Sequence, residues 1–234
     1  LFRSARYPVH QKDDSVPLEL ANRLNLKIIS AKWKKIPLVL EGGSIDVNGF
    51  GTLITTEECL LDQNIQPRNP GITKCELEEL FRDFLGITNV IWLNRGIEGD
   101  DTHGHIDDIC RFVDRGTLVL AMETGKSDLN TSILAENMER LEQVRLENGT
   151  KPTVVMLPMP KPIYYKKWRL PASYANFYIA NNVVLVPIFN DPADRKALGI
   201  LSDLFPTRDV IGVCAEDLLI GLGGIHCITL QEPF

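Results

Sequence analysis

Short apolar runs recur along the chain in a fixed order, and they predict a repeated unit of strand, turn, strand, helix and strand. In the first unit the strands are predicted at 44–47, 52–55 and 89–93 and the helix at 73–85. Asn48-Gly49 between two β-rich runs is a strong hairpin signal, since both residues tolerate the positive φ of a tight turn. Thr73 and Glu76 have the spacing of a capping box at the start of the helix.

The same order of elements returns twice. The second unit has predicted strands at 105–113, 117–122 and 153–157 and a helix at 131–146, and the third has strands at 174–180, 183–188 and 209–213 and a helix at 194–204. The turns at Gly49, Gly116 and Asn182 are 67 and 66 residues apart (49 to 116, then 116 to 182). This period predicts an α/β fold of repeated modules around a central axis, resembling a propeller. No linker divides residues 1–234, so we expect a single domain.

Three stretches lie outside the repeat. Residues 18–26 predict a short helix with Pro17 at its first position. The proline- and lysine-rich segment 158–171 predicts a surface loop. The closing stretch 223–231 reads as a half-buried strand that contains Cys227.

Composition and charge narrow the class of protein. With 44% hydrophobic and 24% charged residues, the chain has the composition of an ordinary globular protein, and its net charge of −6 argues against a nucleic-acid partner. No apolar run reaches the ~18 residues of a membrane-spanning helix. Five cysteines without a C-x-x-C pair indicate reduced thiols in a cytoplasmic protein.

Cys227 is the candidate nucleophile, although a lone cysteine in a strand also serves as a small apolar side chain. A reactive thiolate needs cationic or hydrogen-bonding neighbours. If each module begins at the central axis, then residues near the start of each first strand converge there. The repeat thereby makes neighbours of four residues that are distant in sequence: Glu41, His105, Asn176 and Cys227.

A strand at 105–113 would also place His105 and Asp107 on one face, where a carboxylate beside an imidazole supports acid/base chemistry. Glu41 and Asp107 would repel one another unless a cation lies between them, and a planar guanidinium matches carboxylate geometry. This set favours nucleophilic attack on an amidine-type carbon. Asp101 is a candidate for binding a substrate amine, with solvent as its alternative partner.

Two further interpretations concern nearby polar residues. Asp108 and Asp114 are expected to be solvated or to cap turns. A zinc site is the competing hypothesis, in which His103, His105 and Asp107 would be joined by Cys227 or His226.

Five segments together are similar to the agmatine deiminases, within the wider group of bacterial peptidylarginine-deiminase-like enzymes. They are Glu41-Gly42-Gly43-Ser44-Ile45, Gly51-Thr52-Leu53 with Thr55-Thr56-Glu57-Glu58-Cys59-Leu60, Gly99-Asp100-Asp101-Thr102-His103-Gly104-His105-Ile106-Asp107, Ser173-Tyr174-Ala175-Asn176-Phe177-Tyr178, and Gly224-Ile225-His226-Cys227-Ile228-Thr229. The segments follow the family's order from about residue 13 to the end.

The resemblance implies a pentein fold, which is a five-module α/β propeller, and hydrolysis of agmatine to N-carbamoylputrescine and ammonia. It implies that Cys227 forms a covalent amidino intermediate, that His105 is the acid/base, that Asp107 binds the guanidinium and that Glu41 orients the imidazole and ligand nitrogens. No metal or organic cofactor is implied. Family members often form homo-oligomers.

Members of the family also carry an N-terminal module with an Arg-Asp-x-Gly-Pro-like motif, and nothing before Leu18 matches it. We therefore expect a chain that is truncated relative to the family. Two alternatives to agmatine hydrolysis follow: an arginine or peptidylarginine deiminase that acts on another guanidine, and an incomplete pentein that only binds cationic ligands.

Overall fold

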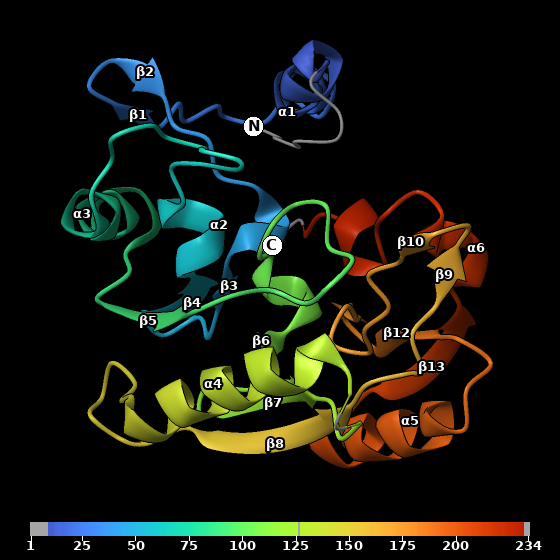
Figure 1. The fold of residues 1–234 in the computed structure, drawn as a ribbon. Helices are drawn as coiled ribbons and strands as arrows, with labels where there is room; N and C mark the ends of the chain where they lie inside the picture. The colour runs from blue at the N-terminus through green and yellow to red at the C-terminus, as the bar shows by residue number, and fades with distance from the viewer. Residues whose placement is uncertain (1–8, 126, 232–234) are drawn as a thin grey trace.

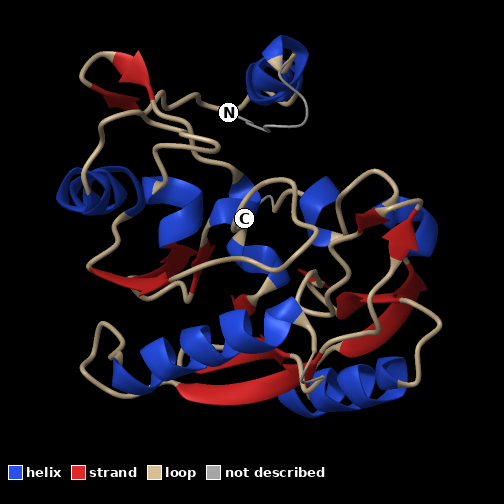
Figure 2. Ribbon diagram, viewed as in Figure 1, coloured by secondary structure: helices blue, strands red, loops and turns tan. Residues whose placement is uncertain are grey.

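The computed structural model of the protein describes residues 9–125 and 127–231, and it contains three three-stranded sheets of identical topology (Figures 1 and 2). In each sheet the first strand pairs antiparallel with the second, and the second pairs parallel with the third. A parallel pair needs a crossover connection, and the connection is helical in every unit, with two helices in the first unit and one in each of the others. The predicted repeat is therefore confirmed.

The three units follow one another along the chain. The first consists of β3 (Asp46–Val47), β4 (Thr52–Thr56), α2 (Glu57–Leu61), α3 (Lys74–Leu85) and β5 (Asn89–Leu93). The second consists of β6 (Cys110–Phe112), β7 (Thr117–Met122), α4 (Leu129–Gln143) and β8 (Thr153–Pro158). The third consists of β11 (Tyr178–Ile179), β12 (Val183–Ile188), α5 (Ala193–Leu204) and β13 (Asp209–Cys214), and α6 (Glu216–Leu219) follows it.

Shorter elements connect and flank these units. Before the first unit lie α1 (Gln11–Arg23), β1 (Lys32–Trp33) and β2 (Ile36–Pro37), and β9 (Tyr164–Tyr165) and β10 (Trp168–Arg169) form a hairpin between the second and third. Three 3₁₀ turns complete the set: η1 (Gly42–Ser44), η2 (Ile106–Asp108) and η3 (His226–Ile228). The described C-terminal end lies in the middle of the molecule in Figure 1.

Three predicted elements differ from those in the structure: the helix at 18–26, the loop at 158–171 and the strand at 174–180. The helix expected at 18–26 spans Gln11–Arg23 and has Pro17 inside it, with acidic side chains in its first turn where they favour a helix start. The predicted loop 158–171 contains the β9–β10 hairpin. Of the strand predicted at 174–180, only Tyr178–Ile179 pairs with a neighbour.

Two further strand predictions are wrong, and they concern the segments that contain the candidate site residues. The segment 105–113 is a 3₁₀ turn followed by the three-residue strand β6, and the stretch 223–231 contains the turn η3 and no strand. The apolar residues of 105–113 are buried or half-buried, whereas Ile228 and Leu230 of the closing stretch are 69% and 70% exposed. Apolar and β-branched composition therefore specified neither the backbone conformation of these segments nor the burial of the closing stretch.

The central strands hold the units together because they are buried on both faces. Side chains alternate along a strand, so Leu118 and Leu120 of β7 join the apolar core shared with the first unit, whereas Val119 joins the core shared with the third. In β4, Ile54 faces the second unit and Leu53 packs toward α3. The sheets themselves are separate, and no closed ring of strands is formed by the described residues. None of the helices in that part of the chain is long and apolar enough to cross a bilayer.

Glu147 joins the hairpin turns of the first two units. Its Oε2 accepts hydrogen bonds from Thr52 Oγ1 at 2.7 Å and Asn48 Nδ2 at 2.8 Å, and its Oε1 accepts from Arg115 Nη2 at 2.9 Å. These bonds, led by the one from Thr52, lower the pKa of Glu147 to about 2. A carboxyl with a lowered pKa stabilises the fold above its unfolded-state pKa, and that contribution is lost as the pH falls through the folded-state value.

We predict that Glu147→Gln lowers the melting temperature by roughly 2–4 °C at neutral pH. The difference from the wild type should shrink as the pH falls from 4.5 towards about 2, where the wild-type carboxyl is itself protonated. Thermal unfolding followed by circular dichroism across this pH range measures both effects. Glu142→Gln, at an exposed position of α4, is the control. A melting difference that is independent of pH would contradict the assignment.

Candidate active site

The three 3₁₀ turns bring the predicted site residues together. Glu41 immediately precedes η1, His105 immediately precedes η2, Asp107 lies within η2, and Cys227 lies within η3. η1 packs against both η2 and η3. The predicted convergence of the module starts is therefore observed, although the side chains are presented by turns and not by strands.

Asp107 is a fully buried carboxylate that contacts residues from two turns. Its Oδ2 lies 2.7 Å from Nδ1 of His226 and 3.6 Å from Sγ of Cys227, and its Oδ1 lies 4.0 Å from Nδ1 of His105. Burial raises the pKa of Asp107, but the hydrogen bond from His226 and the charges of His105 and Arg111 outweigh it and lower the pKa. Asp107 is therefore ionised at neutral pH.

His105 lies between the carboxylates of Asp107 and Glu41. Its Nε2 is 3.9 Å from Oε2 of Glu41, too long for a hydrogen bond but close enough for a strong electrostatic attraction. Burial alone would lower the pKa of His105, but Glu41, Asp107 and Asp100 outweigh it and raise the pKa above its ordinary value. These carboxylates thus favour the protonated imidazole, which is the form that a general acid requires.

Arg68 is the cation that pairs with Glu41. Its Nε lies 3.3 Å from Oε1 and 3.2 Å from Oε2 of Glu41, and its side chain is completely buried. Its guanidinium also donates to the backbone carbonyls of Cys59 and Thr102. Burial raises the pKa of Glu41, but His105 and Arg68 together lower it, so Glu41 is ionised. Sequence reasoning missed Arg68, which lies in a loop between Pro67 and Pro70 without any pattern that would mark it.

Cys227 is exposed at the edge of this group, while its sulfur faces protein side chains. Nδ2 of Asn176 lies 3.3 Å from the sulfur. Desolvation of the thiol and the charges of Asp107 and Asp108 raise its pKa well above the ordinary value, and hydrogen bonds from Gly224 and Asn176 lower it. In the free protein the sulfur is therefore a thiol, and a bound cation would favour the thiolate.

The other aspartates near η2 differ in their burial and in their hydrogen bonds. Asp108 is predicted to be solvated or to cap a turn, but it is buried and its Oδ1 accepts from Nδ2 of Asn176. Desolvation together with Asp107 and Asp100 raises its pKa well above the ordinary value. Asp100 accepts backbone hydrogen bonds from Gly104 at 2.9 Å and His105 at 3.0 Å, which shapes the turn before η2. Asp101 is half-buried in the same turn.

Asp114 caps the Gly116 turn as predicted: its Oδ1 accepts hydrogen bonds from the backbone N–H groups of Gly116 and Thr117.

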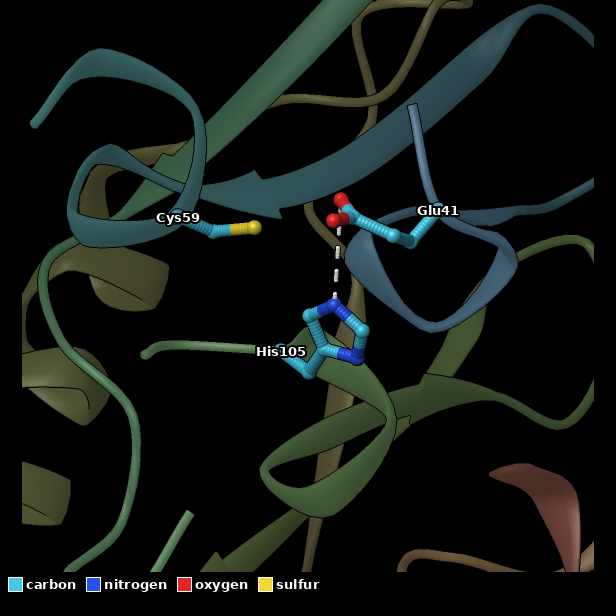
Figure 3. Close-up of side chains that lie close together, drawn as sticks. All are labelled: Glu41, Cys59 and His105. Carbon is cyan, nitrogen blue, oxygen red and sulfur yellow. Dashed lines mark ion pairs between the residues drawn. The ribbon is translucent and has the colours of Figure 1, made fainter. Parts of the chain in front are cut away.

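Glu41, Cys59 and His105 point towards one another from three different segments (Figure 3). They are the only group with metal-ligand character in the described part of the chain, and their ligand atoms lie within 4.8 Å of one another. Ligands of one tetrahedral zinc lie closer, at about 3.3–3.8 Å from each other, and Arg68 already occupies both oxygens of Glu41.

The zinc set suggested by the sequence is not assembled either. The imidazole of His103 bonds Oε1 of Gln66 at 3.2 Å, and His226 bonds Asp107. His226 was considered only as a zinc ligand, so its contact with the central carboxylate is a second feature that the sequence did not reveal. The residues present fit a zinc ion poorly.

Two buried polar atoms at this site have no hydrogen-bond partner: Nε2 of His105 and Oδ1 of Asp107. Buried polar atoms are normally paired, and an unpaired one is costly. A donor such as a guanidinium N–H could bind Oδ1 of Asp107, and protonated Nε2 could donate to a departing amine. The geometry therefore supports binding and protonation of a small cationic group beside Cys227.

Comparison with known proteins agrees with this geometry. The model of the Porphyromonas-type peptidyl-arginine deiminase family matches residues 4–233. An agmatine deiminase of Pseudomonas aeruginosa (strain LESB58) is 38% identical over 99% of this chain and 66% of its own length, and one of Ectopseudomonas mendocina is equally similar over the same shares. This chain thus spans slightly less than two thirds of the length of these curated relatives.

Solved structures of agmatine deiminases are also similar to this chain. The agmatine deiminase of Enterococcus faecalis superposes with a TM-score of 0.86 at 31% identity, over 94% of this chain and 63% of that one. A C. jejuni agmatine deiminase variant with substrate bound gives 0.81 at 34% identity, over 92% and 61%. An amidinotransferase of saxitoxin biosynthesis, at 13% identity and a TM-score of 0.55, shares the fold alone. The chain belongs to the Porphyromonas-type peptidyl-arginine deiminase family.

Proposed function

We propose that this chain carries the catalytic site of an agmatine deiminase, which converts agmatine and water to N-carbamoylputrescine and ammonia. One observation carries the proposal: Oδ1 of Asp107 and Nε2 of His105 are buried without partners beside the thiol of Cys227. A guanidinium supplies the missing donors and a positive charge. The names of the relatives support agmatine as the guanidine.

In the first half of the reaction the Cys227 thiol loses its proton to solvent, and the thiolate sulfur attacks the guanidinium carbon. Asp107 binds the guanidinium N–H groups, and the cation offsets the carboxylates that hold the sulfur as a thiol. A carbon–sulfur bond forms, one carbon–nitrogen bond breaks, and protonated His105 donates its proton to the nitrogen that leaves as ammonia. The amidino group is then covalently attached to Cys227.

In the second half water replaces the sulfur. Neutral His105 accepts a proton from the water as its oxygen bonds to the amidino carbon, and the carbon–sulfur bond breaks. The remaining hydroxyl proton passes to the sulfur as the ureide forms, so Cys227 is again a thiol and His105 is again protonated. Glu41, fixed by Arg68, orients the imidazole for both steps.

The proposal also covers the contact with the substrate's distal amine, the domain organisation, the cellular location and the oligomeric state. Asp101 binds the distal ammonium of agmatine, which suits its half-buried position in the turn before His105. The repeat supports a single catalytic domain that forms part of a closed propeller. Five unpaired cysteines favour a cytoplasmic enzyme, and the resemblance favours a homo-oligomer, which light scattering would test.

We predict that Cys227→Ser abolishes turnover, by about 10³-fold or more, because serine is a much weaker nucleophile near neutral pH. Ammonia release and a colorimetric assay for the ureido product, both with agmatine, measure this. Cys75→Ser, at an exposed free cysteine, should keep wild-type activity. Full turnover by the Cys227 variant would refute the nucleophile. Agmatine binding without ureido product, by wild-type protein shown to be folded, would indicate a binding protein instead.

We predict that Arg68→Met destabilises the protein by about 3–5 kcal/mol, because it leaves the buried Glu41 carboxylate unpaired. Urea unfolding monitored by tryptophan fluorescence measures the loss. The kcat of variant protein that remains folded should also fall, since Glu41 no longer holds a fixed position beside His105.

Arg82→Met, at an exposed arginine of α3, is the matched control and should have little effect on stability. Adding Glu41→Gln to the Arg68 variant should recover part of the stability, since it removes the unpaired charge. Equal stabilities of the Arg68 and Arg82 variants would contradict the importance of the buried pair.

A further inference from the structure

Asn176 lies in the turn before β11 and is completely buried. Its side chain contacts the turn that carries the nucleophile and the turn that carries the central carboxylate. The Oδ1 accepts a hydrogen bond from the backbone N–H of His226 at 2.9 Å. The Nδ2 lies 2.9 Å from Oδ1 of Asp108 and 3.3 Å from Sγ of Cys227.

The contact with His226 fixes which way the amide faces. A backbone N–H can only donate, so the oxygen of Asn176 must point at it and the NH₂ group must point at Asp108 and Cys227. The two hydrogens of Nδ2 then have one acceptor each. No alternative orientation of the amide satisfies these neighbours.

The sulfur has different partners in its two protonation states. As a thiol it can donate to Oδ2 of Asp107 or to Oδ1 of Asn176, each 3.6 Å away. As a thiolate it can only accept. Among the side chains described, Nδ2 of Asn176 is the donor that contacts it, and hydrogen bonds to a charged group are stronger than neutral ones.

We propose that Asn176 is a further catalytic residue, whose side-chain amide donates to the Cys227 sulfur and stabilises the thiolate that attacks the substrate. This role rests on the proposed deiminase reaction and deepens it. The amide also holds η3 at a fixed position through the backbone of His226. Its second hydrogen binds Oδ1 of Asp108 at 2.9 Å, which fixes the position of the amide.

A test of this role must separate the effect of the Asn176 amide on the Cys227 thiol from the effects of nearby titratable groups. Asp107 and Asp108 of η2 face it, and His226 of η3 contacts Asp107 on the same side. All of them remain in variants of Asn176. A change in the titration of the Cys227 thiol in those variants therefore reports the lost amide donor.

Alkylation of Cys227 by iodoacetamide, followed by peptide mass spectrometry over a pH range from about 6 to about 10, measures this titration. Asn176→Ala should slow the alkylation of Cys227 about tenfold at a fixed pH below the thiol pKa, which corresponds to one pH unit of displacement. Asn176→Asp keeps the oxygen that His226 needs but replaces the donor by a carboxylate, so the profile should move further to high pH. Cys75, exposed in the same molecule, is the internal control.

Asn137→Ala is the matched variant, because Asn137 is also completely buried and bonds the loop at Asn94 and Arg95. It should leave the alkylation profile of Cys227 unchanged. Near-UV circular dichroism checks that each protein is folded. If Asn176→Ala does not fold, the isosteric variant Asn176→Asp provides the test. A profile of folded Asn176→Asp that coincides with the wild type would overturn the proposal.

Activity is a separate measurement. In the Asn176 variants kcat with agmatine should fall about tenfold or more, while KM changes little, because the amide contacts the nucleophile and not the bound guanidinium. Alkylation needs no guanidine substrate. A wild-type protein that fails to hydrolyse agmatine would therefore refute the proposed function, whereas an unchanged thiol titration would refute only the role of Asn176.

Discussion

The buried carboxylate of Asp107 is the charge on which the candidate site depends. It is ionised although no solvent reaches it, because His226 bonds one of its oxygens at 2.7 Å and His105 lies 4.0 Å from the other. A buried charge with these partners is tolerated, and one without them is not. His105 immediately precedes η2, the turn that contains Asp107, whereas His226 comes from η3 near the end of the described chain. The fold must therefore assemble before this carboxylate can be stable.

The charges around Asp107 explain why the site suits a cation. Glu41 and Asp107 lie near Arg68 and near the imidazole of His105, whose pKa they raise, while desolvation and neighbouring carboxylates raise the pKa of Asp108. The pKa of Cys227 is raised in the same surroundings. Ionisation of this thiol would add a negative charge beside Asp107, and a bound guanidinium would compensate that charge. In the proposed reaction, substrate binding and ionisation of the thiol are coupled in this way.

The sequence predicted most of the architecture and much of the site, but not the conformation of the segments that carry the site. Periodic turns at Gly49, Gly116 and Asn182 revealed three equivalent modules, and equivalence placed Glu41, His105 and Cys227 near one axis. The segments predicted as strands around His105 and Cys227 contain 3₁₀ turns, because apolar composition does not specify which backbone hydrogen bonds form. Arg68 was not predictable, since its partner Glu41 is 27 residues away and only the folded chain brings them together.

Two cysteines lie at this site, Cys59 near Glu41 and Cys227 near Asp107, and they differ in exposure. Cys59 points at Glu41 and His105 in Figure 3, but it is fully buried, and desolvation raises its pKa well above the ordinary value. Its thiol has no route to a substrate and behaves as a small core residue. The pKa of Cys227 is also raised, yet this residue is exposed and Nδ2 of Asn176 lies 3.3 Å from its sulfur. Exposure and one hydrogen-bond donor therefore distinguish the proposed nucleophile from Cys59.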